Sequence, residues 1–266
     1  MNPDIPSTPP SRSLKGKVAI VTGAGCLGTG IGNGRAISIF LASDECSVIC
    51  VDLNLQWATQ TVNMIPGRGQ AFPFQADVTS SEDCQAAVRF AIEKFGRLDI
   101  LVNNVGIAGG MEINVASMVQ MSKHAIPEMV KNDGEMKGSI VNMGSVAGLK
   151  GGTPHLLYPT AKGAVVNLTR AMAAHHAPDG IRVNCVCPGM LYTPMMYGNG
   201  MSEEAREARR KRSLLGTEGN GWDCAGAVVF LAGPHARWMT GVILPVDAGT
   251  TAAVGIGMTK SASVNA

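Results

Sequence analysis

Short apolar runs rich in β-branched residues alternate with longer stretches of helical periodicity along most of the chain. The apolar runs are bounded by Gly, Pro, Asn or Asp, as buried strands usually are. They cover residues 18–22, 47–51, 100–102, 139–143, 182–186 and 242–246, and the helical stretches cover residues 35–42, 82–95, 117–130, 160–175 and 222–232. This alternation predicts right-handed βαβ units, and therefore an α/β fold with a doubly wound, mostly parallel sheet and helices on both faces.

The length of the chain, 266 residues, allows a substantial buried core, and nothing in the sequence marks an internal domain boundary. We expect a flexible extension over residues 1–13, which are rich in proline and serine, and a single domain over residues 14–266. Glycines are frequent near residues 190–220, so we expect a mobile substrate-binding region there. The mixed charges of residues 203–212 predict a solvated helix face.

Charge and cysteine content argue against several classes of protein. A formal net charge of +2 gives no basis for binding nucleic acid, and no apolar run reaches the ~18 residues needed to span a membrane. The seven cysteines are scattered without a C-x-x-C pair, and we expect Cys185 and Cys187 to point apart. We therefore predict no disulfide framework, no metal site and a reducing, cytoplasmic location.

A glycine-rich segment, residues 22–32, lies between the first predicted strand and the first predicted helix. Glycines permit a tight turn there and let backbone N–H groups approach a pyrophosphate at the helix N-terminus. An ordinary flexible loop is the alternative, but the position between strand and helix favours a dinucleotide site. The residues expected to bind the cofactor in this segment are Gly23, Gly28, Gly30, Ile31 and Gly32.

Asp52 ends the second predicted strand, twenty residues after Gly32. A carboxylate at this place accepts hydrogen bonds from the adenosine ribose and repels a 2′-phosphate. The next residues, Leu53 and Asn54, supply no cation that would attract that phosphate. The sequence therefore favours NAD(H) over NADP(H), although a turn residue at the end of a strand would look the same.

Further motifs follow in a family-typical order: Asp77-Val78, Asn103-Asn104-Val105-Gly106, Ser145, Tyr158-x-x-x-Lys162, and Pro188-Gly189 with Thr193. With these motifs, residues 14–253 resemble the short-chain dehydrogenase/reductase (SDR) family in its single-domain form of about 250 residues. The glycine segment departs from the family pattern by three extra residues before Gly30. The resemblance implies a Rossmann fold and reversible hydride transfer between a nicotinamide and a secondary alcohol or ketone.

The same resemblance assigns the remaining cofactor contacts. It implies that Asp77 and Val78 pack around the adenine and that Asn104 and Gly106 belong to the cofactor site at the end of the fourth strand. It implies that Pro188, Gly189 and Thr193 hold the nicotinamide carboxamide. Tyr158 and Lys162 also count among the cofactor contacts, because the family's lysine binds the nicotinamide ribose.

The predicted catalytic residues are Ser145, Tyr158 and Lys162. Tyr158 and Lys162 are four residues apart, so a helix would place them on one face. The Lys162 ammonium would favour the Tyr158 phenolate, which lets a tyrosine act as acid or base near neutral pH. Ser145 would bind and orient the same substrate oxygen. Pro159 fits best in a first helical turn, so we expect Tyr158 near the start of its helix.

Asn114 matches the family's fourth catalytic residue by its distance from Pro127, but the segment before it is short. Only residues 107–113 separate it from Gly106, and seven residues extend at most about 23–25 Å. We expect Asn114 near a frayed helix start, where its catalytic support would be impaired. This departure keeps open a second reading, a catalytically impaired NAD-binding protein.

Three residues near the motifs are candidate substrate contacts: His155, Met195 and Met196. A loop or lid-packing role is the alternative for each of them. Beside the leading function, an isomerase or epimerase that recycles bound NAD stays a third reading. By the family resemblance we expect a homotetramer or homodimer acting on a small-molecule alcohol or ketone.

Overall fold

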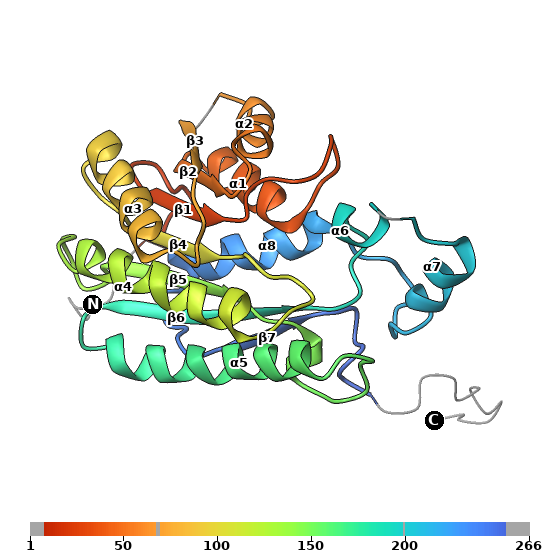
Figure 1. The fold of residues 1–266 in the computed structure, drawn as a ribbon. Coiled ribbons are helices and arrows are strands. Elements are labelled where there is room, and N and C mark those ends of the chain that lie inside the picture. The colour runs from red at the N-terminus through yellow and green to blue at the C-terminus, as the bar shows by residue number, and fades with distance from the viewer. Residues whose placement is uncertain (1–7, 68–69, 199, 254–266) are drawn as a thin grey trace.

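The computed structural model describes residues 8–67, 70–198 and 200–253. Seven parallel strands form one sheet in the order β3-β2-β1-β4-β5-β6-β7 (Figure 1). The strands are β1 (Val18–Thr22), β2 (Ser47–Asp52), β3 (Ala71–Gln75), β4 (Ile100–Asn103), β5 (Gly138–Met143), β6 (Ile181–Pro188) and β7 (Ile243–Val246). This is the doubly wound sheet that the alternating pattern predicts.

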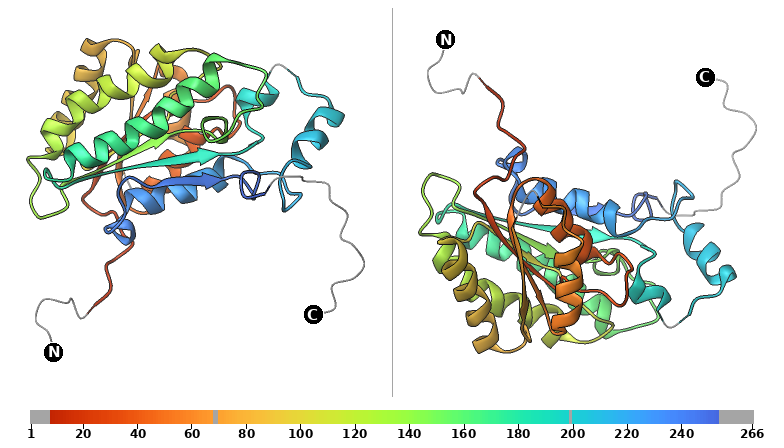
Figure 2. Two further views of the ribbon diagram at one scale, coloured as in Figure 1. Left: turned by 90° about the horizontal axis from the view of Figure 1, so that it is seen from below. Right: turned by 90° about the horizontal axis from the view of Figure 1, so that it is seen from above.

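Helices cover both faces of the sheet, as predicted (Figures 1 and 2). The helices α1 (Asn33–Ser43) and α8 (Gly221–Ala232) pack against each other on one face, and α2 (Leu55–Asn63) lies beside β2 and β3. The other face carries α3 (Ser81–Phe95), α4 (Ser117–Met129) and α5 (Leu157–His176). The central strands are buried because apolar side chains pack against helices on both sides.

Both edge strands of the sheet contain a proline, Pro73 in β3 and Pro245 in β7. At the β3 edge the pairing starts with Val48 N, which donates to the Gln70 carbonyl. At the β7 edge it starts with Cys185 N, which donates to the Val242 carbonyl. In a parallel ladder, positions 73 and 245 then direct their nitrogens away from the neighbouring strand. A proline costs no ladder hydrogen bond at such a position.

Neither β3 nor α2 was predicted from the sequence. The β3 segment, Ala-Phe-Pro-Phe-Gln, lacks β-branched residues and holds Pro73, which counts against a strand until its place at the edge is known. Asn54 begins α2 by accepting a hydrogen bond from Trp57 N at 3.2 Å, which caps the N-terminus of the helix.

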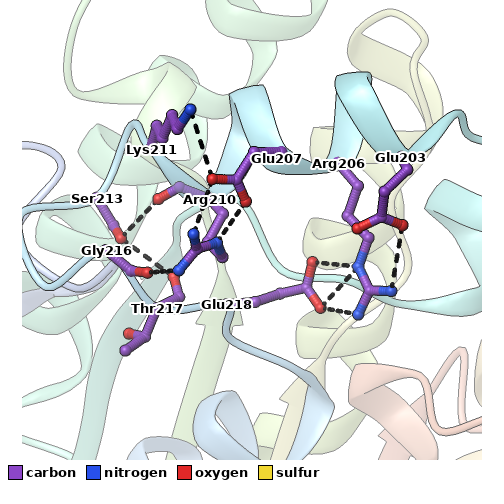
Figure 3. A network of polar contacts seen from close by, with 9 residues as sticks. All are labelled: Glu203, Arg206, Glu207, Arg210, Lys211, Ser213, Gly216, Thr217 and Glu218. Carbon is purple, nitrogen blue, oxygen red and sulfur yellow. Dashed lines mark hydrogen bonds and ion pairs between the residues drawn. The ribbon is translucent and has the colours of Figure 1, made fainter.

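Beyond the carboxyl ends of the strands lie α6 (Pro194–Tyr197) and α7 (Glu203–Arg210). The α7 helix confirms the solvated helix expected from its charges, since none of its residues is buried. Figure 3 shows how these charges pair: Arg206 with Glu218 and Arg210 with Glu207. The expected mobility of residues 190–220 stays a prediction, and residue 199 lies outside the described residues.

One expectation about the cysteines was wrong. Cys185 and Cys187 lie on the same side of β6, with their sulfur atoms 3.7 Å apart, because residues two apart in a strand share a face. All seven cysteines are buried thiols without a disulfide. Of the predicted extension and domain, residues 1–7 and 254–266 lie outside the described residues.

Candidate active site

A cleft of about 840 Å³ runs along the carboxyl ends of the strands. It spans the point between β1 and β4 where the strand order reverses, the usual ligand site of such sheets. The predicted residues that line it are Gly23, Gly32, Asp52, Asp77, Val78, Asn104, Gly106, Ser145, Tyr158, Lys162, Pro188, Gly189, Thr193, Met195 and Met196. Residues as far apart in the sequence as Gly23 and Met196 thus share one cavity.

The glycine-rich segment brings α1 close against the end of β1. A Cβ atom at Gly34 would overlap the Gly23 carbonyl, and one at Gly25 would lie 2.7 Å from an Asp52 oxygen. Gly23 has φ +61°, a conformation that side chains disfavour. The segment therefore leaves room for a ligand at the N-terminus of α1, as binding of a dinucleotide phosphate requires.

Asp52 lies at the end of β2 and is largely buried. One carboxylate oxygen accepts a hydrogen bond from Gly25 N at 2.8 Å, and the other accepts from Asn54 N at 2.9 Å. These two bonds hold the carboxylate against the glycine segment, where it lines the cleft. A negative charge is thus fixed at the end of the cleft that also contains Trp57, Asp77 and Val78.

Ser145, Tyr158 and Lys162 meet in the cleft, as predicted. Ser145 follows β5, and its Oγ accepts a hydrogen bond from Ala147 N at 3.1 Å. Tyr158 lies in the first turn of α5, which begins at Leu157, three residues before the predicted start. Lys162 lies one turn further on the same helix, with its Nζ 5.9 Å from the centre of the Tyr158 ring.

Lys162 is almost fully buried beneath the cleft, with a relative exposure of 3%. Its Nζ donates to the Met143 carbonyl at 2.8 Å. Burial lowers the pKa of Lys162 to about 8, although the nearby Cys185 and Cys187 thiols act in the opposite direction. A Cβ atom at Gly106 would lie 2.9 Å from Nζ, so only glycine lets the lysine occupy this place.

Asn114 lies near the start of its helix, as expected, but this start is closed by hydrogen bonds of the asparagine side chain and not frayed. It lies in a π-helical turn, Glu112–Ala116, that leads directly into α4. Its side chain is fully buried. Its Nδ2 contacts the carbonyls of Ile107, Gly109 and Gly110 at 3.1, 3.0 and 3.0 Å, and its Oδ1 accepts from Ile107 N at 3.2 Å. The asparagine thereby closes the shortened segment onto the helix.

Several predicted residues do not reach the cleft surface. Gly28 is exposed on the outer part of the glycine segment, and a Cβ atom at Gly30 would overlap Pro194 of α6. Ile31 packs partly buried against the core. His155 is exposed before α5 and does not line the cleft within the described residues. The roles predicted for these four residues remain predictions.

Two arginines near the cleft were missed by the sequence analysis. Arg209 of α7 lines the cleft and donates to the Leu191 carbonyl at 3.2 Å. Arg35 of α1 is fully buried beside the glycine segment. No sequence signal distinguishes them, because an arginine in a helical stretch usually lies in solvent.

The fold and the site together define a nucleotide-binding oxidoreductase: a doubly wound sheet, a glycine turn at its switch point, and a Ser–Tyr–Lys group in the same cleft. A family model described as enoyl-(acyl carrier protein) reductase matches residues 28–251. The chain belongs to the short-chain dehydrogenase/reductase family, whose members here are dehydrogenases and reductases acting on CH–OH groups.

Relatives of known activity align over nearly the whole chain. Meso-2,3-butanediol dehydrogenase of Serratia marcescens is 35% identical over 90% of this chain and 96% of its own length. The 2-(S)-hydroxypropyl-CoM dehydrogenase 3 of Xanthobacter autotrophicus is 38% identical over 91% and 99%. A solved 7α-hydroxysteroid dehydrogenase, in complex with NADH and 7-oxo glycochenodeoxycholic acid, has a TM-score of 0.81 and 34% identity, covering 90% and 95%.

Two other kinds of feature are absent from the described residues. No helix among them is long and apolar enough to cross a membrane. No cluster of three or more His, Cys, Asp or Glu side chains in the same part of the chain is arranged to hold a metal ion.

Proposed function

We propose that the protein interconverts a secondary alcohol and a ketone with NAD(H) as the hydride carrier. The observation that carries the proposal is the meeting of Ser145, Tyr158 and Lys162 in one cleft with the glycine segment. The relatives named as dehydrogenases of butanediol and of a 7α-hydroxysteroid support a secondary alcohol as substrate.

The cleft fits a dinucleotide along its length. Gly23, Gly32 and the N-terminus of α1 would hold the diphosphate, and Pro188, Gly189 and Thr193 would hold the nicotinamide end. The fixed carboxylate of Asp52 would bind the adenosine ribose and disfavour a 2′-phosphate, which supports NAD(H) over NADP(H). When bound, the cofactor supplies or accepts the hydride.

The residues of the chain supply the proton and the orientation. In ketone reduction the Tyr158 hydroxyl donates its proton to the substrate oxygen, and in alcohol oxidation the phenolate takes that proton back. The Ser145 hydroxyl orients the same oxygen from the end of β5. Lys162 places its charge below the Tyr158 ring, where it favours the phenolate.

The proposal is tested by following the reduced-nicotinamide absorbance with a panel of secondary alcohols and ketones. The Tyr158→Phe variant keeps the ring but loses the proton, so we expect kcat to fall about 10²- to 10⁴-fold with unchanged NADH affinity. Tyr192→Phe, which removes a hydroxyl outside the cleft lining, is the matched control. A Tyr158→Phe rate equal to that of the wild type would refute the assignment.

The same assays distinguish the other two functions. An NAD-binding protein without catalysis would bind NADH but turn over none of the panel. An isomerase or epimerase would form product without any net change in nicotinamide absorbance. Asn114 closes the shortened segment through its side-chain hydrogen bonds, but it is fully buried and is not among the residues that line the cleft. Turnover therefore decides between an intact and an impaired catalytic site.

We also propose that the protein is a homo-oligomer and works in the cytoplasm. The resemblance to the family, whose members form oligomers, supports this proposal. So does Trp238, because an indole with a relative exposure of 88% is apolar surface that a subunit contact would cover. The support for a reducing location is the set of seven thiols without a disulfide.

A further inference from the structure

Arg35 is a fully buried arginine in the first turn of α1, directly behind the glycine segment. Its Nη1 donates to the carbonyls of Gly28 and Gly30 at 2.8 and 2.5 Å, and its Nη2 donates to that of Cys26 at 3.0 Å. Three carbonyls of the lengthened glycine segment thus converge on one guanidinium.

The remaining donors of Arg35 tie the segment to α2. Its Nε donates to Thr61 Oγ1 at 3.0 Å, and Nη2 also donates to Gln60 Oε1 at 3.4 Å. The Thr61 hydroxyl in turn contacts the Ala24 carbonyl at 2.8 Å. All five N–H donors of the guanidinium therefore have acceptors. Within the described chain no carboxylate oxygen lies within 4.0 Å of it, so no ion pair neutralises its charge.

The direction of these carbonyls fixes the direction of the amides. In a trans peptide the N–H of the next residue points opposite to the carbonyl, and the described chain has no cis peptide bond. The carbonyls of residues 26, 28 and 30 face Arg35, so the N–H groups of Leu27, Thr29 and Ile31 point away from it. Backbone N–H groups that point outward from a loop can donate to an anion, and Leu27 is the residue of these three that lines the cleft.

We propose that Arg35 is a positioning residue of the dinucleotide site, which orders the lengthened glycine segment for the diphosphate and adds a buried positive charge behind it. The proposal rests on the NAD(H) binding proposed above. Without the guanidinium, a segment containing Gly25, Gly28 and Gly30 would sample many conformations, and ordering it would weaken binding. The uncompensated charge attracts the diphosphate directly.

The experiment compares Arg35→Met with the wild type by titrating NADH fluorescence and by using ADP and adenosine as competitors. We expect the Kd of NADH and of ADP to rise roughly tenfold or more, since a charge and an ordered anion site are both lost. The Kd of adenosine, which has no phosphate, should change less than about twofold. A merely structural role would change ADP and adenosine binding alike.

The chain offers a matched control in Arg182 of β6. This second buried arginine also binds carbonyls, those of Leu231, Met239, Ala232 and Gly233, but at the end of the sheet away from the cleft. Arg182→Met should lower the melting temperature and leave the Kd of NADH unchanged.

Each outcome decides between the proposals. If the wild type binds NADH and Arg35→Met binds it and ADP equally well, the role of Arg35 is refuted while the proposed function stands. If the wild type binds no NADH, the proposed function fails first. Should Arg35→Met not fold, Arg35→Lys keeps the charge with fewer donors, and an unchanged ratio of ADP to adenosine affinity would overturn the proposal.

Discussion

At the scale of single residues, the chemistry depends on charges held where water is scarce. Lys162 and Asp52 are both largely buried at the cleft, and each is fixed by hydrogen bonds to or from the backbone. Their effects can be measured separately, because the lysine acts on proton transfer and the aspartate on the choice of nucleotide.

The burial of Lys162 predicts a pH-dependent stability. Its pKa falls from 10.5 to about 8 on folding, so between these pH values the unfolded chain holds a proton that the folded chain has lost. Stability from this residue therefore rises with pH across that window, by about 3 kcal/mol in all. Urea unfolding of the cofactor-free protein at pH 7 and pH 10 measures it.

Lys162→Met supplies the reference for that measurement, because groups far from the lysine contribute alike in both proteins. The unfolding free energy of the wild type should rise relative to that of Lys162→Met as the pH increases from 7 to 10. A constant difference between the two proteins would contradict the depressed pKa of the lysine.

Asp52 predicts a change in cofactor preference. Asp52→Asn removes the charge that repels a 2′-phosphate, so kcat/KM with NADPH relative to NADH should rise roughly tenfold or more. Asp77→Asn is the control, since Asp77 also lines the cleft but is exposed and binds Thr79 instead. An equal shift in both variants would mean that the general charge of the cleft, and not Asp52, decides the preference.

Residue positions were predictable from the sequence where a motif fixes the spacing. Tyr158, Lys162 and Ser145 were placed correctly because four residues make one helical turn and a serine after a buried strand reaches the same edge. Arg35 could not be predicted, since its burial depends on carbonyls that face it only once the glycine segment has folded.

At the scale of elements, the short connection between β4 and α4 is the main departure from the family. The sequence showed that seven residues precede Asn114, but not how the chain would close so short a link. A π-helical turn closes this short link, and the Asn114 side chain holds it closed by contacting three backbone carbonyls. Side-chain hydrogen bonds of this kind produce no periodic pattern in the sequence, so they could not be predicted from it.

Asn114→Asp tests that closure. The substitution replaces a donor that faces three carbonyls with a negative oxygen, so we expect unfolding free energy to fall by about 3 kcal/mol or more. Asn114→Ala, which removes the bonds without adding repulsion, should cost about 2 kcal/mol. Urea unfolding checks both, and an Asp variant more stable than the Ala variant would contradict the arrangement.

At the scale of the whole molecule, the sheet and its two helical layers followed from the alternation of runs and helices alone. The edge strand β3 was missed because a proline is compatible with a strand only at certain positions, such as the edge of a sheet. The local sequence does not reveal which strand lies at the edge. The surface left by this fold includes Trp238 and Phe230, two exposed aromatic residues at the end of α8 and just beyond it.

The exposed aromatics predict where subunits meet. Light scattering after size exclusion should give the wild type the mass of a dimer or tetramer, and Trp238→Glu should shift it to a smaller species because a charge replaces buried apolar area. Leu215→Glu changes another strongly exposed apolar side chain, near α7, and should leave the mass unchanged. A monomeric wild type would rule out the predicted assembly.

The two prolines in the outermost strands have a consequence for behaviour at high concentration. An open parallel sheet presents rows of unpaired backbone groups that invite another chain to join, which is a common start of fibrils. Pro73 and Pro245 each remove a donor from the middle of such a row, one on either flank of the sheet. Both edges of the sheet therefore resist uncontrolled growth from chain to chain.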